Sequence, residues 1–143
     1  MAGSMCILVA TFSAPVQAQT YTVLHKFMGS DGSYPYGLIV DSAGNLYGAL
    51  FQGGAYGYGS VFKLDQAGNE TVLYNFKGGT DRRNPLGSLV RDSAGNLYGA
   101  ALYGGIGGST CAGAGCGAVF KIDPAGNETV VNRFPGVPVT EQH

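Results

Sequence analysis

One unit is used twice along this chain, and this internal repetition constrains the fold more than any other feature of the sequence. The stretch DSAGNLYGA at 41–49 returns unchanged at 92–100, and VFKLDQAGNE at 61–70 returns at 119–128 with two substitutions. A third motif, T-V-(L/V)-x-x-F, begins at Thr22, Thr71 and Thr129. Matches in the same order do not arise by chance, so the chain contains two copies of one unit, and the second copy is the longer.

Each unit contains four short segments that are rich in β-branched and aromatic residues and are bounded by glycine-rich turns. In the first unit these segments are 37–40, 45–50, 60–64 and 70–76. Two of the connections between them share the pattern Asp-x-Ala-Gly-Asn. In this pattern the Asp side chain can cap the turn, and Gly adopts the positive φ that closes a short hairpin. The pattern predicts antiparallel strands that are joined in chain order.

Four antiparallel strands in roughly fifty residues is the size of one β-propeller blade. We therefore predict an all-β fold of two four-stranded antiparallel propeller-type blades, which is an incomplete β-propeller or repeat array. The expected parts are blade one at about 36–76, blade two at about 87–134 and an extra strand at 22–27. Two blades cannot close a ring, since four or more are needed to cover every blade face. We therefore expect self-association of the chain, or a place within a longer array.

The composition agrees with this architecture. Glycine accounts for 25 of the 143 residues, beside nine Tyr and seven Phe, which is typical of many tight turns between short aromatic strands. Outside the extreme N-terminus no stretch has the apolar spacing of an amphipathic helix, so helix should be scarce. The net charge of −1 offers no basic surface to nucleic acid or to an anionic membrane, so neither is an expected partner.

Residues 1–18 have the pattern of a secretory signal peptide. An apolar run at 5–14 is too short to span a bilayer, and Val16 and Ala18 follow where signal peptidase requires small residues. A buried N-terminal strand is the alternative. Cleavage after Ala18 predicts a secreted, periplasmic or cell-surface protein. Its two remaining parts are a repeat domain at 19–134 and a tail at 135–143.

The cysteines support export. The same cleavage removes Cys6 and leaves Cys111 and Cys116, an even pair in an oxidising compartment. The pair does not fit a zinc-binding pattern, because there is no second cysteine pair and both His25 and His143 lie far away in sequence. We therefore predict a disulfide between Cys111 and Cys116, inside the long loop of the second unit.

Three motifs together resemble a known repeat. They are DSAGNLYG at 41–48 and 92–99, G-x-G-x-V-F-K at 57–63 and 115–121, and a G-x-D…P stretch formed by Gly29, Asp31 and Pro35. The units resemble the GloVer-type extracellular tandem repeat of bacteria and, more distantly, the blade of two-component-regulator propellers. The resemblance covers residues 22–134. It implies a secreted or surface-displayed array with no assigned chemistry.

Catalytic groups are scarce in the sequence. His25 lies in a predicted strand and His143 is the last residue, so neither is placed to serve a nucleophilic Ser or Cys. Asp31 and Asp81 occupy equivalent loops and could form a carboxylate pair if neighbouring blades stack, although solvated loop aspartates are the commoner outcome. We therefore predict no enzymatic activity, no cofactor and no metal site, with an extracellular carbohydrate hydrolase or lyase as the alternative.

Recognition is expected at the end of the blades opposite the Asp-x-Ala-Gly-Asn hairpins. The hairpins keep their length between the two units, whereas the connections at this loop end vary, and variable loops on a fixed scaffold commonly carry recognition. The candidate ligand-facing residues in these loops are Asp31, Tyr34, Tyr56, Tyr58, Asp81, Arg82 and Tyr103. The sequence thus predicts a non-catalytic repeat module with a structural or binding role, possible ligands being a polysaccharide or another cell-surface component.

Overall fold

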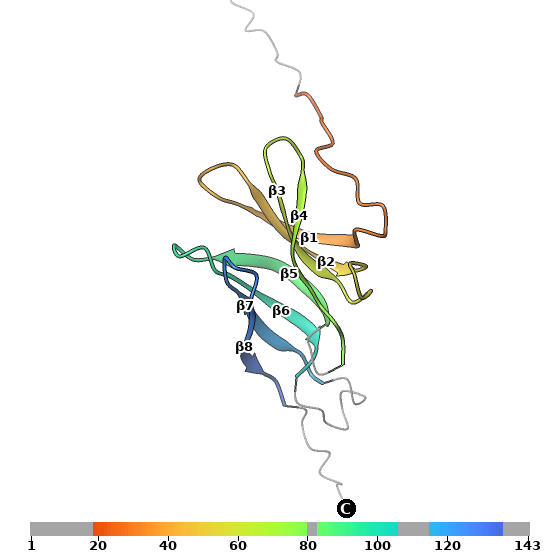
Figure 1. The fold of residues 1–143 in the computed structure, drawn as a ribbon, viewed down its shortest axis with the longest axis vertical. Coiled ribbons are helices and arrows are strands. Elements are labelled where there is room, and N and C mark those ends of the chain that lie inside the picture. The colour runs from red at the N-terminus through yellow and green to blue at the C-terminus, as the bar shows by residue number, and fades with distance from the viewer. Residues whose placement is uncertain (1–18, 80–82, 106–114, 136–143) are drawn as a thin grey trace, which may run out of the picture.

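The computed structural model describes residues 19–79, 83–105 and 115–135, and in these ranges it contains eight β-strands and no helix. The strands form two four-stranded antiparallel sheets, each joined in chain order, and neither sheet closes into a barrel (Figure 1). The first sheet consists of β1 (Ser33–Val40), β2 (Leu46–Gln52), β3 (Ser60–Leu64) and β4 (Glu70–Asn75). The second consists of β5 (Arg83–Arg91), β6 (Leu97–Tyr103), β7 (Ala118–Ile122) and β8 (Glu128–Arg133). The predicted all-β fold of two four-stranded blades is confirmed.

The first strand of each sheet starts slightly before the predicted beginning of its blade. β1 begins at Ser33 and β5 begins at Arg83. Both strands contain a proline, at Pro35 and Pro85. An edge strand tolerates a residue without a backbone N–H group, and β1 and β5 each pair with a neighbour on one side only.

The hairpin turns are held by the aspartate and glycine of the repeated motif. Asp41 Oδ1 accepts hydrogen bonds from the backbone N–H groups of Ala43 and Asn45, both at 2.9 Å. The Asn45 side chain donates to Asp41 Oδ2 at 2.9 Å, and the Tyr47 hydroxyl donates to the same oxygen at 3.0 Å. Gly44 has a φ of +79°, which an L side chain rarely adopts. The same aspartate-to-asparagine cap recurs at Asp65, Asp92 and Asp123.

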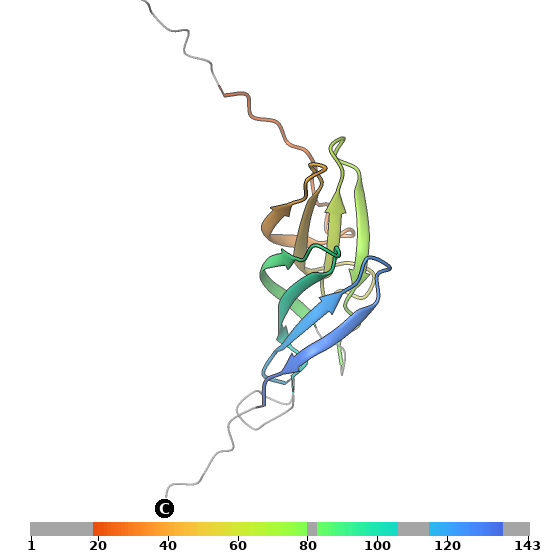
Figure 2. The same cartoon turned by 90° about the vertical axis from the view of Figure 1, so that its left-hand side faces the viewer.

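The two sheets pack face to face, and their contact forms the main hydrophobic core (Figure 2). Phe76, directly after β4, is fully buried and meets Phe120 of β7 with ring centroids 5.1 Å apart at 68°. Gly99 of β6 makes room for this contact, because a Cβ there would lie 2.4 Å from Phe120 Cζ. Both sheets contribute to the core cluster, which consists of Tyr47, Ala49, Val61, Phe76, Leu89, Leu97, Ala101, Phe120 and Ile122.

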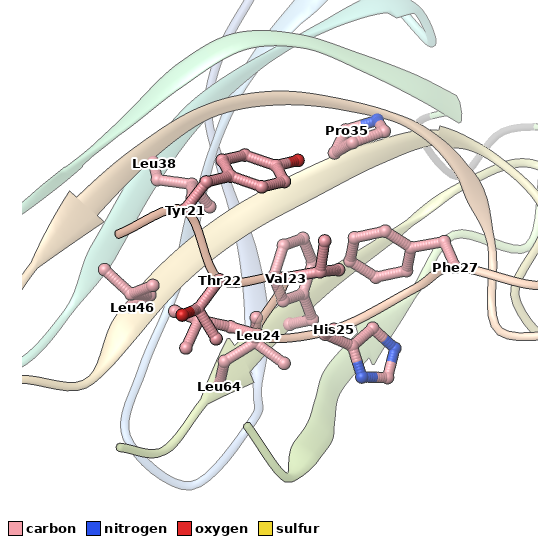
Figure 3. Close-up of a pocket in the computed structure, with 11 residues that line it drawn as sticks. Tyr21, Thr22, Val23, Leu24, His25, Phe27, Pro35, Leu38, Leu46 and Leu64 are labelled. Atoms are coloured by element: carbon pink, nitrogen blue, oxygen red, sulfur yellow. The ribbon is translucent and has the colours of Figure 1, made fainter. Parts of the chain in front are cut away.

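Residues 22–27 do not form the predicted extra strand. They lie outside any strand and run across a face of the first sheet (Figure 3). Phe27 packs on Phe62 of β3 with ring centroids 5.0 Å apart at 64°, as Phe76 packs on Phe120. The segment therefore packs on the first sheet in the same way as the end of β4 packs on the second sheet. A strand needs a neighbouring strand to satisfy its backbone, and none of the described strands pairs with this segment, so the prediction of a strand is wrong.

The outer face of the second sheet lacks a covering sheet in the described part of the chain. Its apolar residues have counterparts in the first sheet that are buried between the sheets. Phe134 is 45% exposed, whereas its counterpart Phe76 is 0% exposed. Val131 is 55% exposed, whereas its counterpart Leu73 packs against the core. This outer face therefore resembles the faces that are buried between the sheets, but no sheet among the described residues covers it.

The aspartate caps predict that the fold is sensitive to acid. The hydrogen bond from the Asn45 side chain is the main cause that lowers the pKa of Asp41 from 3.8 to about 2, against an opposing effect of burial. The fold prefers the charged carboxylate, so this contribution is present above about pH 4 and is lost as the pH falls toward about 2. We expect the midpoint of thermal unfolding, followed by circular dichroism, to fall over this range.

The variant Asp41→Asn serves as the control for the acid effect. It keeps the shape of the cap but removes one titrating carboxyl group, so its unfolding midpoint should depend less on pH between about pH 4 and about pH 2. A midpoint of the unaltered chain that stays constant over this range, or an equal pH dependence in the variant, would contradict the prediction.

The uncovered outer face predicts weak, concentration-dependent self-association. The first sheet of a second copy can pack on this face in the same way as the two sheets pack within one chain. Such a contact joins the copies head to tail. Residues 22–27 already occupy the matching face of the first sheet, so they must move aside and the contact should be weak. Light scattering coupled to size exclusion over a dilution series should therefore show oligomers at high concentration.

The variant Val131→Lys tests the face itself. It places a charge in the contact and should weaken association by at least about tenfold, because a buried unpaired charge is costly. Ala125→Lys, in the exposed turn between β7 and β8, adds the same charge away from the face and should associate normally. If the chain is a monomer at every concentration and unfolds in one cooperative transition, the prediction is wrong. Two sheets would then form a stable fold without self-association.

Candidate functional site: the loop end of the two sheets

The connections at the loop end are tied to one another by hydrogen bonds. The backbone N–H of Asn84, in β5, donates to the carbonyl oxygen of Tyr58 at 2.8 Å, and the Asn84 side chain donates to the carbonyl oxygen of Phe51 at 2.9 Å. The backbone N–H of Ala55 donates to the side-chain oxygen of Asn75 at 2.9 Å. The loop between β2 and β3 is therefore fixed by contacts with both the end of β4 and the start of the second sheet.

Glycine allows the loop before β1 to touch the loop after β2. A Cβ at Gly53 would lie 2.5 Å from the Cα of Gly32 and 2.8 Å from the carbonyl oxygen of Gly29. Tyr34, just after this contact, has a φ of 55°, and Asn84 at the equivalent place in the second sheet has a φ of 58°. This left-handed conformation costs a non-glycine residue on the order of 1 kcal/mol, and such strain is often found at functional sites.

Three of the predicted ligand-facing tyrosines are exposed at this end. Tyr34, Tyr56 and Tyr58 are 64%, 53% and 37% exposed. Lys77 Nζ lies 6.0 Å from the centroid of the Tyr56 ring. The Tyr58 ring lies against Gly78, where a Cβ would be 2.4 Å from a ring carbon. The loop end thus offers aromatic surface and one nearby cation on a backbone that is held in place.

The other predicted site residues are placed only in part. Tyr103 ends β6 and pairs in register with Arg83, which puts it at the loop end of the second sheet. Asp81 and Arg82 lie outside the described residues. The suggested approach of Asp31 to Asp81 therefore stays a prediction.

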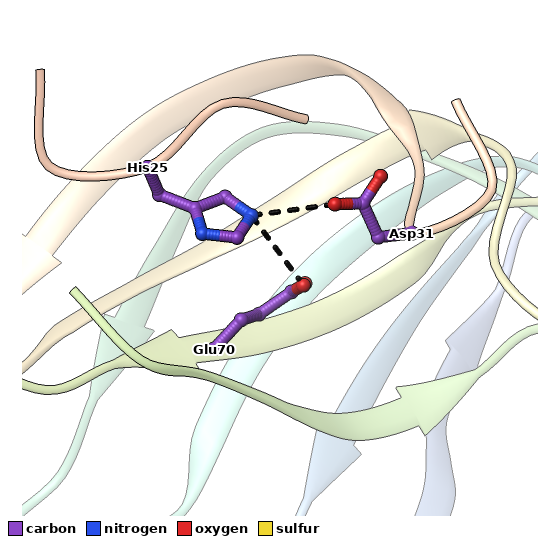
Figure 4. A group of neighbouring side chains, drawn as sticks. All are labelled: His25, Asp31 and Glu70. Carbon is purple, nitrogen blue, oxygen red and sulfur yellow. Dashed lines mark hydrogen bonds and ion pairs between the residues drawn. The ribbon is translucent and has the colours of Figure 1, made fainter. Parts of the chain in front are cut away.

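Asp31 belongs to a cluster with His25 and Glu70 (Figure 4). His25 Nε2 lies 3.3 Å from Asp31 Oδ2 and 3.6 Å from Glu70 Oε2. The three side chains come from the N-terminal segment, from the loop before β1 and from the first residue of β4. They are partly buried, with His25, Asp31 and Glu70 side chains 21%, 25% and 12% exposed.

The two carboxyl groups of this cluster lie in different environments. The backbone N–H of Met28 donates to Asp31 Oδ1 at 2.7 Å, and this hydrogen bond is the main cause that lowers the pKa of Asp31. Burial is the main cause that raises the pKa of Glu70, and the interaction with His25 opposes it. Glu70 Oε1 is buried and has no hydrogen-bond partner among the residues that the structure describes.

The sequence does not predict this cluster. The motif at 22–27 places His25 in a predicted strand that serves no nucleophilic Ser or Cys, and no motif marks Glu70 as a site residue. A signal was nevertheless present in the repeat. The motif at 22–27 carries His25 where the next copy carries Tyr74, whereas Glu70 has an identical counterpart in Glu128. The packing of the N-terminal segment on the first sheet was needed to show that the unusual histidine meets the repeated glutamate.

Two hollows are lined by residues other than the exposed Tyr34, Tyr56 and Tyr58. One is lined mainly by apolar side chains and lies between the N-terminal segment and the first sheet, beside Leu38, Leu46 and Phe62 (Figure 3). The other lies near the hairpin turns and is lined by residues of both sheets, among them Lys63 and Arg91. The variable loops of the sequence point to the loop end and predict neither hollow.

The repeated four-stranded sheets correspond to a known family of repeats. The model of the Gloeobacter/Verrucomicrobia repeat matches residues 9–142. The chain belongs to this repeat family. The match spans both sheets and confirms the resemblance to the GloVer-type repeat. No curated protein matches the chain. The described part of the chain contains no helix that is long and apolar enough to cross a membrane.

The second unit of this Gloeobacter/Verrucomicrobia repeat chain carries the two cysteines in the connection between β6 and β7. Cys116 lies shortly before β7 and is half-buried, whereas Cys111 lies outside the described residues. The disulfide between them therefore stays a prediction.

Intact mass after alkylation without reductant tests this disulfide. In protein recovered from an oxidising compartment, we expect no label on Cys111 or Cys116. Closing so short a loop should stabilise the fold by about 2 kcal/mol, so the double variant Cys111→Ser/Cys116→Ser should lose up to about that much unfolding free energy. Two labelled thiols in the unaltered protein would refute the bond.

Proposed function

We propose that this member of the Gloeobacter/Verrucomicrobia repeat family is an extracellular, non-catalytic module that binds polysaccharide at the loop end of its sheets. The observation that carries the proposal is the exposure of Tyr34, at the start of β1, and of Tyr56 and Tyr58, on a loop that is fixed by hydrogen bonds. A tyrosine ring offers a flat apolar face to a sugar ring and a hydroxyl group for hydrogen bonding, and it loses little rotamer entropy on binding.

Charge narrows the class of ligand. The chain has a net charge of −1, so it exerts no strong long-range attraction on a polyanion. A neutral polysaccharide of the cell envelope or its surroundings is therefore the best chemical match. Export, which the proposal requires, is supported by the signal-like pattern of residues 1–18 and by the cysteine pair that remains after cleavage.

Binding to a glycan array, followed by affinity measurement on the best neutral glycan, tests the proposal. Tyr56→Ala should lower the affinity by about tenfold, because an aromatic contact contributes roughly 0.5–1.5 kcal/mol beyond its buried area. Tyr21→Ala is the matched control, since Tyr21 is 90% exposed in the N-terminal segment. The Tyr21→Ala variant should bind the same glycan with the affinity of the unaltered chain.

Two results would count against the proposal. The first is no binding to any neutral glycan on the array, and the second is an equal loss of affinity in Tyr21→Ala and Tyr56→Ala. Turnover of a polysaccharide that is abolished by Asp31→Ala or Asp81→Ala would instead support the alternative, an extracellular carbohydrate hydrolase or lyase.

A further inference from the structure

The cluster of His25, Asp31 and Glu70 has the composition and spacing of a metal site. One imidazole nitrogen and two carboxylate oxygens lie within 4.8 Å of one another. In a tetrahedral site with bonds of about 2.0–2.2 Å, neighbouring ligand atoms are roughly 3.3–3.6 Å apart. The distances of 3.3 Å and 3.6 Å from His25 Nε2 to Asp31 Oδ2 and Glu70 Oε2 match two edges of such a site (Figure 4). A bound ion would draw together the two carboxylate oxygens, which lie within 4.8 Å of each other, to form the third edge.

Neighbouring groups orient two of these ligands. The backbone N–H of Met28 holds Asp31 Oδ1 at 2.7 Å, which leaves Oδ2 turned toward the histidine. The His25 ring packs edge-on against Phe27, with centroids 4.8 Å apart at 65°. Contacts of this kind fix the direction of a metal ligand and strengthen binding.

The charges of the cluster favour a cation. Two carboxyl groups lie near the same imidazole nitrogen, His25 Nε2, and the Glu70 side chain is only 12% exposed. Glu70 Oε1 is buried without a hydrogen-bond partner in the described part of the chain, which is costly unless another group compensates for it. A divalent cation held between the side chains would compensate both carboxylates at once.

We propose that His25, Asp31 and Glu70 bind one divalent transition-metal ion, with zinc as the best match, and that the ion fastens the N-terminal segment to β4. The imidazole ligand favours a transition metal. Calcium needs six to eight oxygen ligands and magnesium a near-ideal octahedron, and the three side chains supply too few oxygens for either. The remaining coordination position is open to water.

The need for such a fastening differs between the two sheets. Tyr74 occupies the place of His25 in the next copy of the motif, and there the motif forms β4, which pairs with β3. The segment at 22–27 pairs with no described strand and is held by side-chain packing such as that of Phe27 on Phe62. Pairing with β3 holds in place the copy of the motif that packs on the second sheet. A metal ion would hold in place the copy at 22–27, which packs on the first sheet.

Isothermal titration of zinc chloride into the full chain, freed of metal by a chelator and with its cysteines oxidised, tests the proposal. We expect one zinc ion per chain. His25→Tyr, which copies the residue of the second unit, should keep the fold and lower zinc affinity by at least about tenfold, as should Glu70→Gln. Glu128→Gln is the matched control, since Glu128 is the counterpart of Glu70, and it should bind as the unaltered chain does.

Two further measurements locate the ion. Zinc should slow amide hydrogen exchange at residues 22–31 in the unaltered chain but not in His25→Tyr. The cobalt form should lack the charge-transfer band of a thiolate ligand. The proposal is overturned by absence of zinc binding, by equal zinc affinity in His25→Tyr, by an equal loss in Glu128→Gln, or by a thiolate band.

Discussion

The contact on which the rest of the structure depends is a phenylalanine at the end of one unit packed on a phenylalanine of the next sheet. Phe76 lies on Phe120 with ring centroids 5.1 Å apart, and the absence of a side chain at Gly99 leaves the space that the Phe120 ring occupies. Phe27 repeats the contact on Phe62 of the first sheet. The same kind of ring contact, used twice, thus sets both how the sheets stack and where the N-terminal segment lies.

Both candidate sites follow from this stacking. Phe27 anchors the N-terminal segment on the first sheet, and this brings His25 to Glu70 at the start of β4. The packing of the second sheet brings Asn84 against the carbonyl oxygen of Tyr58, which fixes the loop that carries the exposed Tyr56 and Tyr58. A tyrosine surface and a metal-binding cluster therefore share one structural cause, although they use different residues and call for different ligands.

The sequence predicted the parts of the fold that local chemistry controls. The hairpin turns were predictable because Asp41 caps a turn formed by its immediate neighbours, and Gly44 supplies the positive φ within the same few residues. The His25 cluster was not predictable from composition or spacing, because its members meet only after the N-terminal segment packs across a sheet. The extra strand at 22–27 was mispredicted for the same reason, since its sequence is that of a strand but no described strand lies beside it to pair.

The amino-acid sequence by itself determined the repeated unit, its four strands, their order and the turns between them, because these depend on side-chain alternation and on backbone conformations within a few residues. The tertiary structure alone decided which apolar residues are covered. Phe76 and Phe134 stand at equivalent places in their units, yet Phe76 is 0% exposed and Phe134 is 45% exposed. The reason is physical: burial depends on the presence of a neighbouring sheet, which equivalent residues need not share.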